Sequence, residues 1–133
     1  MASFYATIKS RFDADGTLVP SPFNELFMGD APKDEDYPFC VLVPNEETKL
    51  SRSFGGSKFH EEAFAFHVVA RTQEAVETYA DLVEAAFNDC EIELSVTGLT
   101  VIRLDKESRR YEQDEKDVWE CVVEYVTEFE EAA

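Results

Sequence analysis

The side chains best suited to acid–base or metal chemistry in this chain of 133 residues are two histidines and three cysteines. His60 and His67 are seven residues apart, so on one strand they would point to opposite faces of a sheet and could not share a metal ion without a bulge. Cys40, Cys90 and Cys121 are far apart and form no CxxC pair, which argues against a disulfide framework and favours synthesis in a reducing, intracellular compartment. Packed side chains are therefore preferred over a cysteine–histidine catalytic pair.

Carboxylates are too abundant for any one pair to stand out as an acid–base site. Glu120, Glu124 and Glu128 recur at every fourth position, which at ~3.3 Å per residue of strand puts neighbours roughly 13 Å apart, too far to share a proton. The chain contains no P-loop, GxGxxG, HExxH or GxSxG motif and no calcium-binding loop of the EF-hand pattern. We therefore predict that the protein is not an enzyme and has no catalytic residue, metal site or cofactor.

Composition narrows the class of protein further. A net charge of −17, from 29 acidic and 12 basic residues, disfavours sequence-specific nucleic-acid binding and repels anionic membranes. Hydrophobic residues at 44% and aromatic residues at 13% argue against disorder, and the length suits one domain over residues 1–133. The N-terminus does not have the pattern of a signal peptide, and no window is long and apolar enough to span a bilayer.

The longest regular pattern is the alternation over residues 118–130, which predicts a long β-strand. One face of this strand is suited to a hydrophobic core and carries Trp119, Cys121, Val123, Tyr125, Thr127 and Phe129. The other face interleaves the valines Val118, Val122 and Val126 with the glutamates Glu120, Glu124, Glu128 and Glu130. Such a face needs either a surface that tolerates concentrated negative charge or a partner that covers the valines.

Two helices are expected to cover the core face. Near the N-terminus Phe4, Ile8 and Phe12 recur at every fourth position, which predicts a short opening helix. Thr72 is a good N-cap for the main helix. The apolar stripe of that helix consists of Val76, Tyr79, Ala80, Val83, Ala86 and Phe87.

The other strands are shorter in this interpretation. They are expected at residues 25–28, 39–43, 62–70 and 99–104, while residues 92–96 fit a short strand or an extended connection. Residues 45–58 lack an apolar period and are interpreted as a long mobile loop, and the charged residues 105–117 as a long hairpin loop; both are expected to become ordered on binding. The predicted fold class is α+β, a single domain with a mostly antiparallel sheet packed against one main helix plus an N-terminal helix.

This order of elements resembles the small tail-completion, or tail-terminator, proteins of tailed bacteriophages and prophages. The resemblance rests on an opening helix, the strand start Tyr37-Pro38-Phe39-Cys40-Val41-Leu42-Val43, a long variable loop, a strand and an amphipathic helix, and a charged loop with Arg109-Arg110-Tyr111 before a long last strand. It covers nearly the whole chain as a pattern. It implies a structural subunit that forms a homo-oligomeric ring, typically a hexamer, in the virion tail after synthesis in the bacterial host cytoplasm.

The resemblance also implies partners, namely the tail tube protein and the head–tail connector proteins, and it implies no catalytic residues. Two surface hypotheses are compatible with such a ring. Subunit interfaces would use the basic island Lys49, Arg52 and Lys58 and the valine stripe Val118, Val122 and Val126. Channel-facing carboxylates would let DNA slide past without sticking, and these are Glu120, Glu124 and Glu128.

Two other classes of protein stay open at this point. One is a stand-alone acidic α+β binding or regulatory module that works through protein–protein interaction, and recovery of a basic partner without a ring would favour it. The other is a small-molecule enzyme, which would require a deep pocket with a perturbed carboxylate or with His67 near a cysteine.

Overall fold

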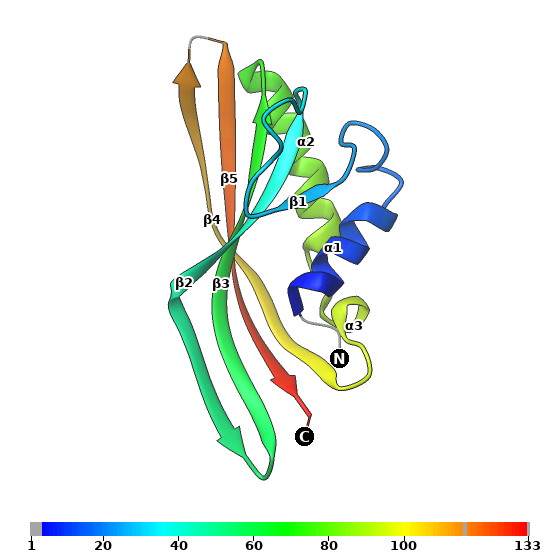
Figure 1. Ribbon diagram of the computed structural model, residues 1–133, viewed down its shortest axis with the longest axis vertical. Helices are drawn as coiled ribbons and strands as arrows, with labels where there is room; N and C mark the ends of the chain where they lie inside the picture. Colours follow the sequence, from blue (N-terminus) through cyan, green and yellow to red (C-terminus); the bar gives the residue numbers. More distant parts are fainter. Residues whose placement is uncertain (1–3, 116, 133) are drawn as a thin grey trace.

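The protein folds into one twisted sheet with its helices on one side (Figure 1). The computed structural model describes residues 4–115 and 117–132, with the side chains of residues 46–49, 92, 114 and 115 outside the description. Five strands form the sheet in the order β1-β2-β3-β5-β4, with only the β1–β2 pair parallel. The elements are α1 (Phe4–Ala14), β1 (Leu26–Met28), β2 (Phe39–Phe54), β3 (Ser57–Ala70), α2 (Gln73–Phe87), α3 (Glu91–Leu94), β4 (Leu99–Glu115) and β5 (Val118–Glu131).

This arrangement confirms the predicted α+β class, with a mostly antiparallel sheet packed against a main helix and an N-terminal helix. The core lies between the sheet and the helices, where the predicted apolar face of α1 is buried. Phe66 of β3 is at its centre, with its ring 6.3 Å from that of Phe12, 4.8 Å from Phe87 and 5.8 Å from Tyr125. The core face of β5 is buried as predicted, with Trp119 at its partly buried end.

The start of α2 confirms the predicted cap. Thr72 has extended backbone angles of φ −134° and ψ 153°, and its Oγ1 accepts a hydrogen bond from the Ala75 amide at 3.1 Å. That bond satisfies one of the amides that a helix start leaves unpaired, and Glu74 in the first turn complements the helix dipole.

The prediction of a mobile loop at residues 45–58 is wrong. β2 continues to Phe54 and β3 begins at Ser57, so these residues form the outer half of a long hairpin, the lower projection in Figure 1. Gly55 and Gly56 make its two-residue turn with φ of +55° and +88°, values that suit the twist of a hairpin and that glycine adopts readily. Most of the hairpin is exposed on both faces, which is why its sequence has no core-facing alternation.

Residues 105–117 were also predicted as a loop, and this is wrong for the part that the structure describes. β4 runs through to Glu115 and pairs with β5 along its whole length. Register shifts between Val101 and Arg103, between Lys106 and Ser108, and after Gln113 break the two-residue period that would have identified the strand. Residues 91–94 form the short helix α3 in place of the expected strand or extended connection.

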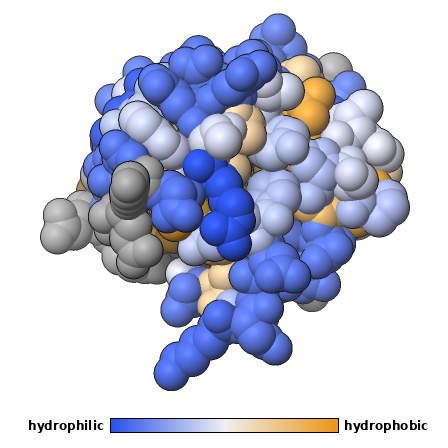
Figure 2. Space-filling view, turned by 90° about the horizontal axis from the view of Figure 1, so that it is seen from above, coloured by the Kyte–Doolittle hydropathy of each residue, from blue (hydrophilic) through white to orange (hydrophobic). Residues whose placement is uncertain are grey.

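The surface and the cysteines agree with the expected character of the chain. Seen from the end that carries the β4–β5 turn, the molecule is mainly hydrophilic, with hydrophobic side chains in small patches (Figure 2). All three cysteines are buried, and burial raises the pKa of Cys40 well above its usual range and that of Cys90 to about 11. These thiols therefore stay neutral. Among the described residues, no helix combines the length and apolar character needed to cross a membrane.

Candidate functional site

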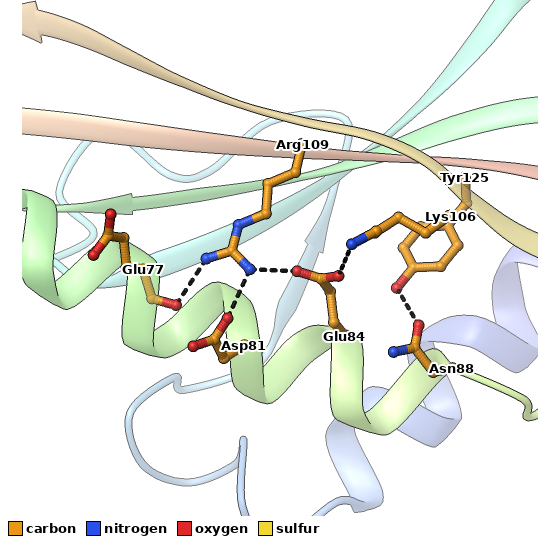
Figure 3. Close-up of polar contacts among 7 residues, drawn as sticks. All are labelled: Glu77, Asp81, Glu84, Asn88, Lys106, Arg109 and Tyr125. Carbon is orange, nitrogen blue, oxygen red and sulfur yellow. Dashed lines mark hydrogen bonds and ion pairs between the residues drawn. The ribbon is translucent and has the colours of Figure 1, made fainter.

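The densest group of charges lies on the helix side of the sheet, between β4 and α2 (Figure 3). Arg109 donates to Asp81 Oδ1 at 2.7 Å, to the Glu77 carbonyl at 3.1 Å and to the buried carboxylate of Glu84. Lys106 Nζ lies 2.7 Å from the other Glu84 oxygen. Both carboxylate oxygens of Glu84 are thus paired. We interpret this group as a clamp that fastens β4 to α2, because each charge is used within the fold.

The ionisation of this group supports the structural interpretation. Burial works against the charged guanidinium, yet the hydrogen bonds to Asp81 and Glu84 raise the pKa of Arg109 further above its usual range. Burial also raises the pKa of Tyr125, whose phenol donates to Asn88 Oδ1 at 3.5 Å. Neither group exchanges a proton near neutral pH, so they supply no acid or base there.

The two histidines point to opposite faces of the sheet, as their spacing predicts. His60 faces the core side, where its ring stacks on Phe129 with the centroids 4.8 Å apart. Its Nδ1 lies 3.0 Å from Ser51 Oγ, and its Nε2 lies 3.0 Å from Glu131 Oε1 without forming a hydrogen bond. His60 therefore ties β2 and β5 together at the base of the hairpin.

His67 lies on the side of the sheet turned away from α1 and α2, which we call the open face. Its Nδ1 lies 3.1 Å from Glu120 Oε1. This hydrogen bond lowers the pKa of Glu120, against the opposing effect of partial burial. The pair consequently holds Glu120 in its ionised form.

Replacing Glu120 by glutamine is expected to change how the free energy of unfolding depends on pH in the acid range. Because the folded-state pKa of Glu120 lies below its unfolded value near 4.5, the stabilisation is complete above that pH and is lost as the pH falls through the folded pKa. We expect Glu120→Gln to be about 0.5–1 kcal/mol less stable at pH 6, and we expect the difference to shrink as the pH falls below 4.5. Urea unfolding across that range measures the difference, with the exposed Glu77→Gln as control. A difference that persists undiminished to pH 3 contradicts the lowered pKa.

The three glutamates predicted to face a channel lie on the open face, and each has a partner within the chain. Glu120 contacts His67 as described, Glu124 pairs with Arg110, and Glu128 Oε1 lies 3.3 Å from Arg103 Nη2. The expected strip of bare negative charge is therefore partly neutralised along its length. Whether these side chains line a channel stays a prediction.

The valine stripe is largely covered within the subunit. Val118 and Val122 are buried by neighbouring strands, whereas Val126 keeps partial exposure. A contact between copies through this stripe would therefore depend mainly on Val126. Its interface role stays a prediction as well.

The basic island does not form one patch. The side chain of Lys49 lies outside the described part of the structure. Arg52 pairs across the hairpin with Phe59 and lies on the open face, while Lys58 pairs with Ser53 and lies on the opposite face. Both are exposed, and within the described residues neither makes an ion pair.

An exposed apolar group on the open face was missed from the sequence. Leu50, Phe54 and Ile102 are 56%, 65% and 52% exposed, unusual values for large hydrophobic side chains. They line one hollow with Arg52 and Phe59, and Glu61 and Glu128 add two carboxylates to its lining. We call the hairpin of residues 50–61 the arm, and we call Leu50, Arg52, Phe54, Phe59 and Ile102 the arm cluster. The two-residue spacing of Leu50, Arg52 and Phe54 could have indicated a strand face, had it not lain in a stretch interpreted as a loop.

The described residues hold no group of three histidine, cysteine or acidic side chains placed to bind a metal ion. What the geometry offers is a two-layer α+β subunit in which most of the described basic side chains have carboxylate partners. Its most exposed large hydrophobic side chains lie on the arm and on the neighbouring part of β4. That description fits a protein that acts through its surface.

Comparisons with known proteins place the fold. One solved structure, described as "Virion of native gene transfer agent (GTA) particle", contains a chain that superposes with a TM-score of 0.78 over 97% of this chain and 95% of that chain. The two sequences are 15% identical, so the likeness establishes a shared fold. No family model and no curated protein matches the sequence.

Proposed function

We propose that this protein is a structural subunit of a phage-like particle, and specifically a tail-terminator, or tail-completion, subunit. In this role several copies form a ring at the head-proximal end of the tail tube and join the tail to the head connector. The observation that carries the proposal is the likeness to a chain of a gene transfer agent virion over nearly the full length of both chains. The pattern of elements in the sequence supports the same role independently.

The surface supports assembly as the mode of action. The arm presents apolar and basic side chains that the subunit itself does not cover, and such surfaces mark protein–protein contacts. Among the members of the predicted interface whose side chains the structure describes, Arg52 and Lys58 are exposed and Val126 is partly exposed. In a ring, Glu120, Glu124 and Glu128 would face the channel, where their pairing with basic side chains moderates the negative field.

Light scattering and negative-stain microscopy of the purified protein test this function. Six or more copies at −17 each repel one another, so we expect rings to be favoured as salt rises from about 0.1 M to about 1 M and the Debye length falls from ~10 Å to ~3 Å. Purified tail tubes from the same genome should acquire a cap of this protein at one end. A chain that stays monomeric at every salt concentration and binds no tube contradicts the proposal. Capture of a basic protein by such a monomer would support a stand-alone acidic binding module.

A further inference from the structure

The arm carries a stretch of strand edge that no other strand covers. β1 pairs with β2 only at residues 40–42, so the outer side of β2 has no neighbouring strand along the arm. In Figure 1 this part of β2 is the free margin of the lower projection. Such an edge presents backbone N–H and C=O groups that can pair with a strand of another molecule.

The other edges of the sheet are covered or irregular. On the outer side of β1, Asp13 Oδ1 accepts a hydrogen bond from the Leu26 amide at 2.8 Å, and Lys9 Nζ donates to the Leu26 carbonyl at 2.7 Å. At the start of β4, the amide and carbonyl of Leu99 bond to those of Val96, and three register shifts follow along the strand. Bulges of this kind keep edge strands from pairing. Among the described strands, the arm therefore carries the edge best suited to strand addition.

The turn of the arm determines which backbone groups point outward. The residues that flank a two-residue hairpin turn form a hydrogen-bonded pair, and such pairs then alternate along the two strands. From Phe54 at the turn back to Leu50, the pairing with β3 continues without a register shift, so every second residue bonds to β3. The N–H and C=O groups of Ser51 and Ser53 therefore point away from β3, where no described residue bonds to them.

This stretch has the same pattern in both directions. Large side chains on the open face alternate with serines in the order Leu50-Ser51-Arg52-Ser53-Phe54. A two-fold axis at Arg52 places Leu50 of one copy beside Phe54 of the other, and Ser51 opposite Ser53. Each serine pair then exchanges both of its backbone hydrogen bonds, and the exposed side chains of Leu50 and Phe54 cover one another.

We infer that two copies of this protein pair through the arm, with residues 50–54 of β2 in one copy adding antiparallel to the same residues of the other. A second copy fits this edge because its apolar and hydrogen-bonding positions are complementary to themselves, while the other described edges are protected. The contact is two-fold, so it joins copies in pairs. It goes beyond the proposed function, because a ring needs a further contact to close.

The charges beside the axis are compatible with this pairing. Arg52 lies opposite Arg52 of the second copy, and like charges in that position repel. Glu61 and Glu128 line the same hollow in each copy, and Glu61 makes no ion pair with any described residue, so a carboxylate is available to offset each arginine. Arg52→Leu should therefore strengthen the pairing about two- to fivefold. A weaker pairing would mean that Arg52 binds an anion on a different surface, which overturns the inference.

A proline on the free edge tests the backbone contact. Ser53→Pro removes the outward N–H and leaves the bonds of its neighbours to β3 in place, so dimer affinity in sedimentation of the full chain should fall about tenfold or more. Ser53→Ala is the matched control, because it keeps the N–H and should change affinity less than about twofold. Slow hydrogen exchange of the Arg52 amide, which bonds to β3, shows that the arm is intact in both variants. A dimer that survives Ser53→Pro overturns the inference.

A single introduced cysteine tests the two-fold axis without altering the outward backbone groups. The native cysteines are buried, and in Arg52→Cys the two new thiols face one another with Cα atoms ~4.5 Å apart, within the range of a disulfide. A mild oxidant should therefore give a covalent dimer and nothing larger. Lys58→Cys, at an exposed position on the inner strand of the arm, is the control and should cross-link about tenfold more slowly. Equal rates overturn the inference.

The outcomes separate the two proposals. A covalent dimer in a protein that forms no rings and caps no tail tubes supports the arm pairing and contradicts the tail-terminator role. Rings or capped tubes, with cross-linking no faster at position 52 than at position 58, overturn the arm pairing and leave the proposed function standing. A wild-type chain that never self-associates, even on tail tubes, overturns both.

Discussion

Replacing Arg109 by alanine is expected to lower the free energy of unfolding by about 2–3 kcal/mol. The side chain is only 18% exposed, and its removal leaves the buried Glu84 with Lys106 as its remaining charged partner. Breaking a fully buried pair costs about 3–5 kcal/mol, and we reduce that figure because Asp81 and Lys106 are accessible to water. Urea unfolding at neutral pH measures the loss. Since the clamp is the main polar tie between β4 and α2, hydrogen exchange along β4 should also accelerate.

The next residue provides a matched control. Arg110 pairs with Glu112 and Glu124 on the open face and is 50% exposed, so Arg110→Ala should change stability by no more than about 0.5 kcal/mol. A double-mutant cycle of Arg109→Ala with Glu84→Ala should show strong coupling, because the second change removes the charge that the first leaves poorly paired. Equal losses for the two arginines would mean that burial at Arg109 adds nothing to its ion pairs.

The elements that could be predicted from the sequence are those with one buried face, because burial makes hydrophobic residues recur at a regular spacing along the chain. β5 alternates because one of its faces covers the core, and α1 and α2 repeat their apolar residues for the same reason. The outer half of the β2–β3 hairpin has no such constraint. Its strands are held by ladder hydrogen bonds and by the turn at Gly55 and Gly56, neither of which needs a hydrophobic pattern. The second half of β4 was not predicted for another reason. Its register shifts move successive side chains between the two faces of the sheet, which breaks the two-residue alternation.

For the candidate functional site, the sequence could indicate which kinds of residue take part but not where they lie relative to one another. The unusual charge of Arg52 and Lys58 could be noticed in the sequence, but their separation onto two faces follows from strand pairing that had been interpreted as a loop. The pairing of Glu124 with Arg110 joins residues 14 apart and depends on the shifted β4–β5 register. The hollow between α1 and the turn after α3 is likewise formed by segments that are distant in sequence. No local pattern encodes contacts of this kind.

Replacing Phe66 by alanine should have the largest effect on stability of any change considered. The side chain is fully buried, and its ring contacts aromatic rings on α1, α2, β3 and β5. Truncating a buried phenylalanine costs about 3–5 kcal/mol, through lost burial and the cavity that remains. That is a large share of the ~5–15 kcal/mol by which a domain of this kind is stable. Thermal and urea unfolding of Phe66→Ala measure the loss.

Phe54→Ala removes the same atoms from the tip of the arm and should have the opposite profile. Its side chain is 65% exposed, so the free energy of unfolding should change by no more than about 0.5 kcal/mol. Self-association should nevertheless weaken about tenfold, because the Phe54 ring is part of the exposed apolar surface that we propose as a contact between subunits. In Phe66→Ala, by contrast, assembly should fall only in proportion to the folded fraction. A Phe54→Ala protein that unfolds early would mean that this side chain stabilises the hairpin itself, and one that assembles normally would remove the arm from the interface.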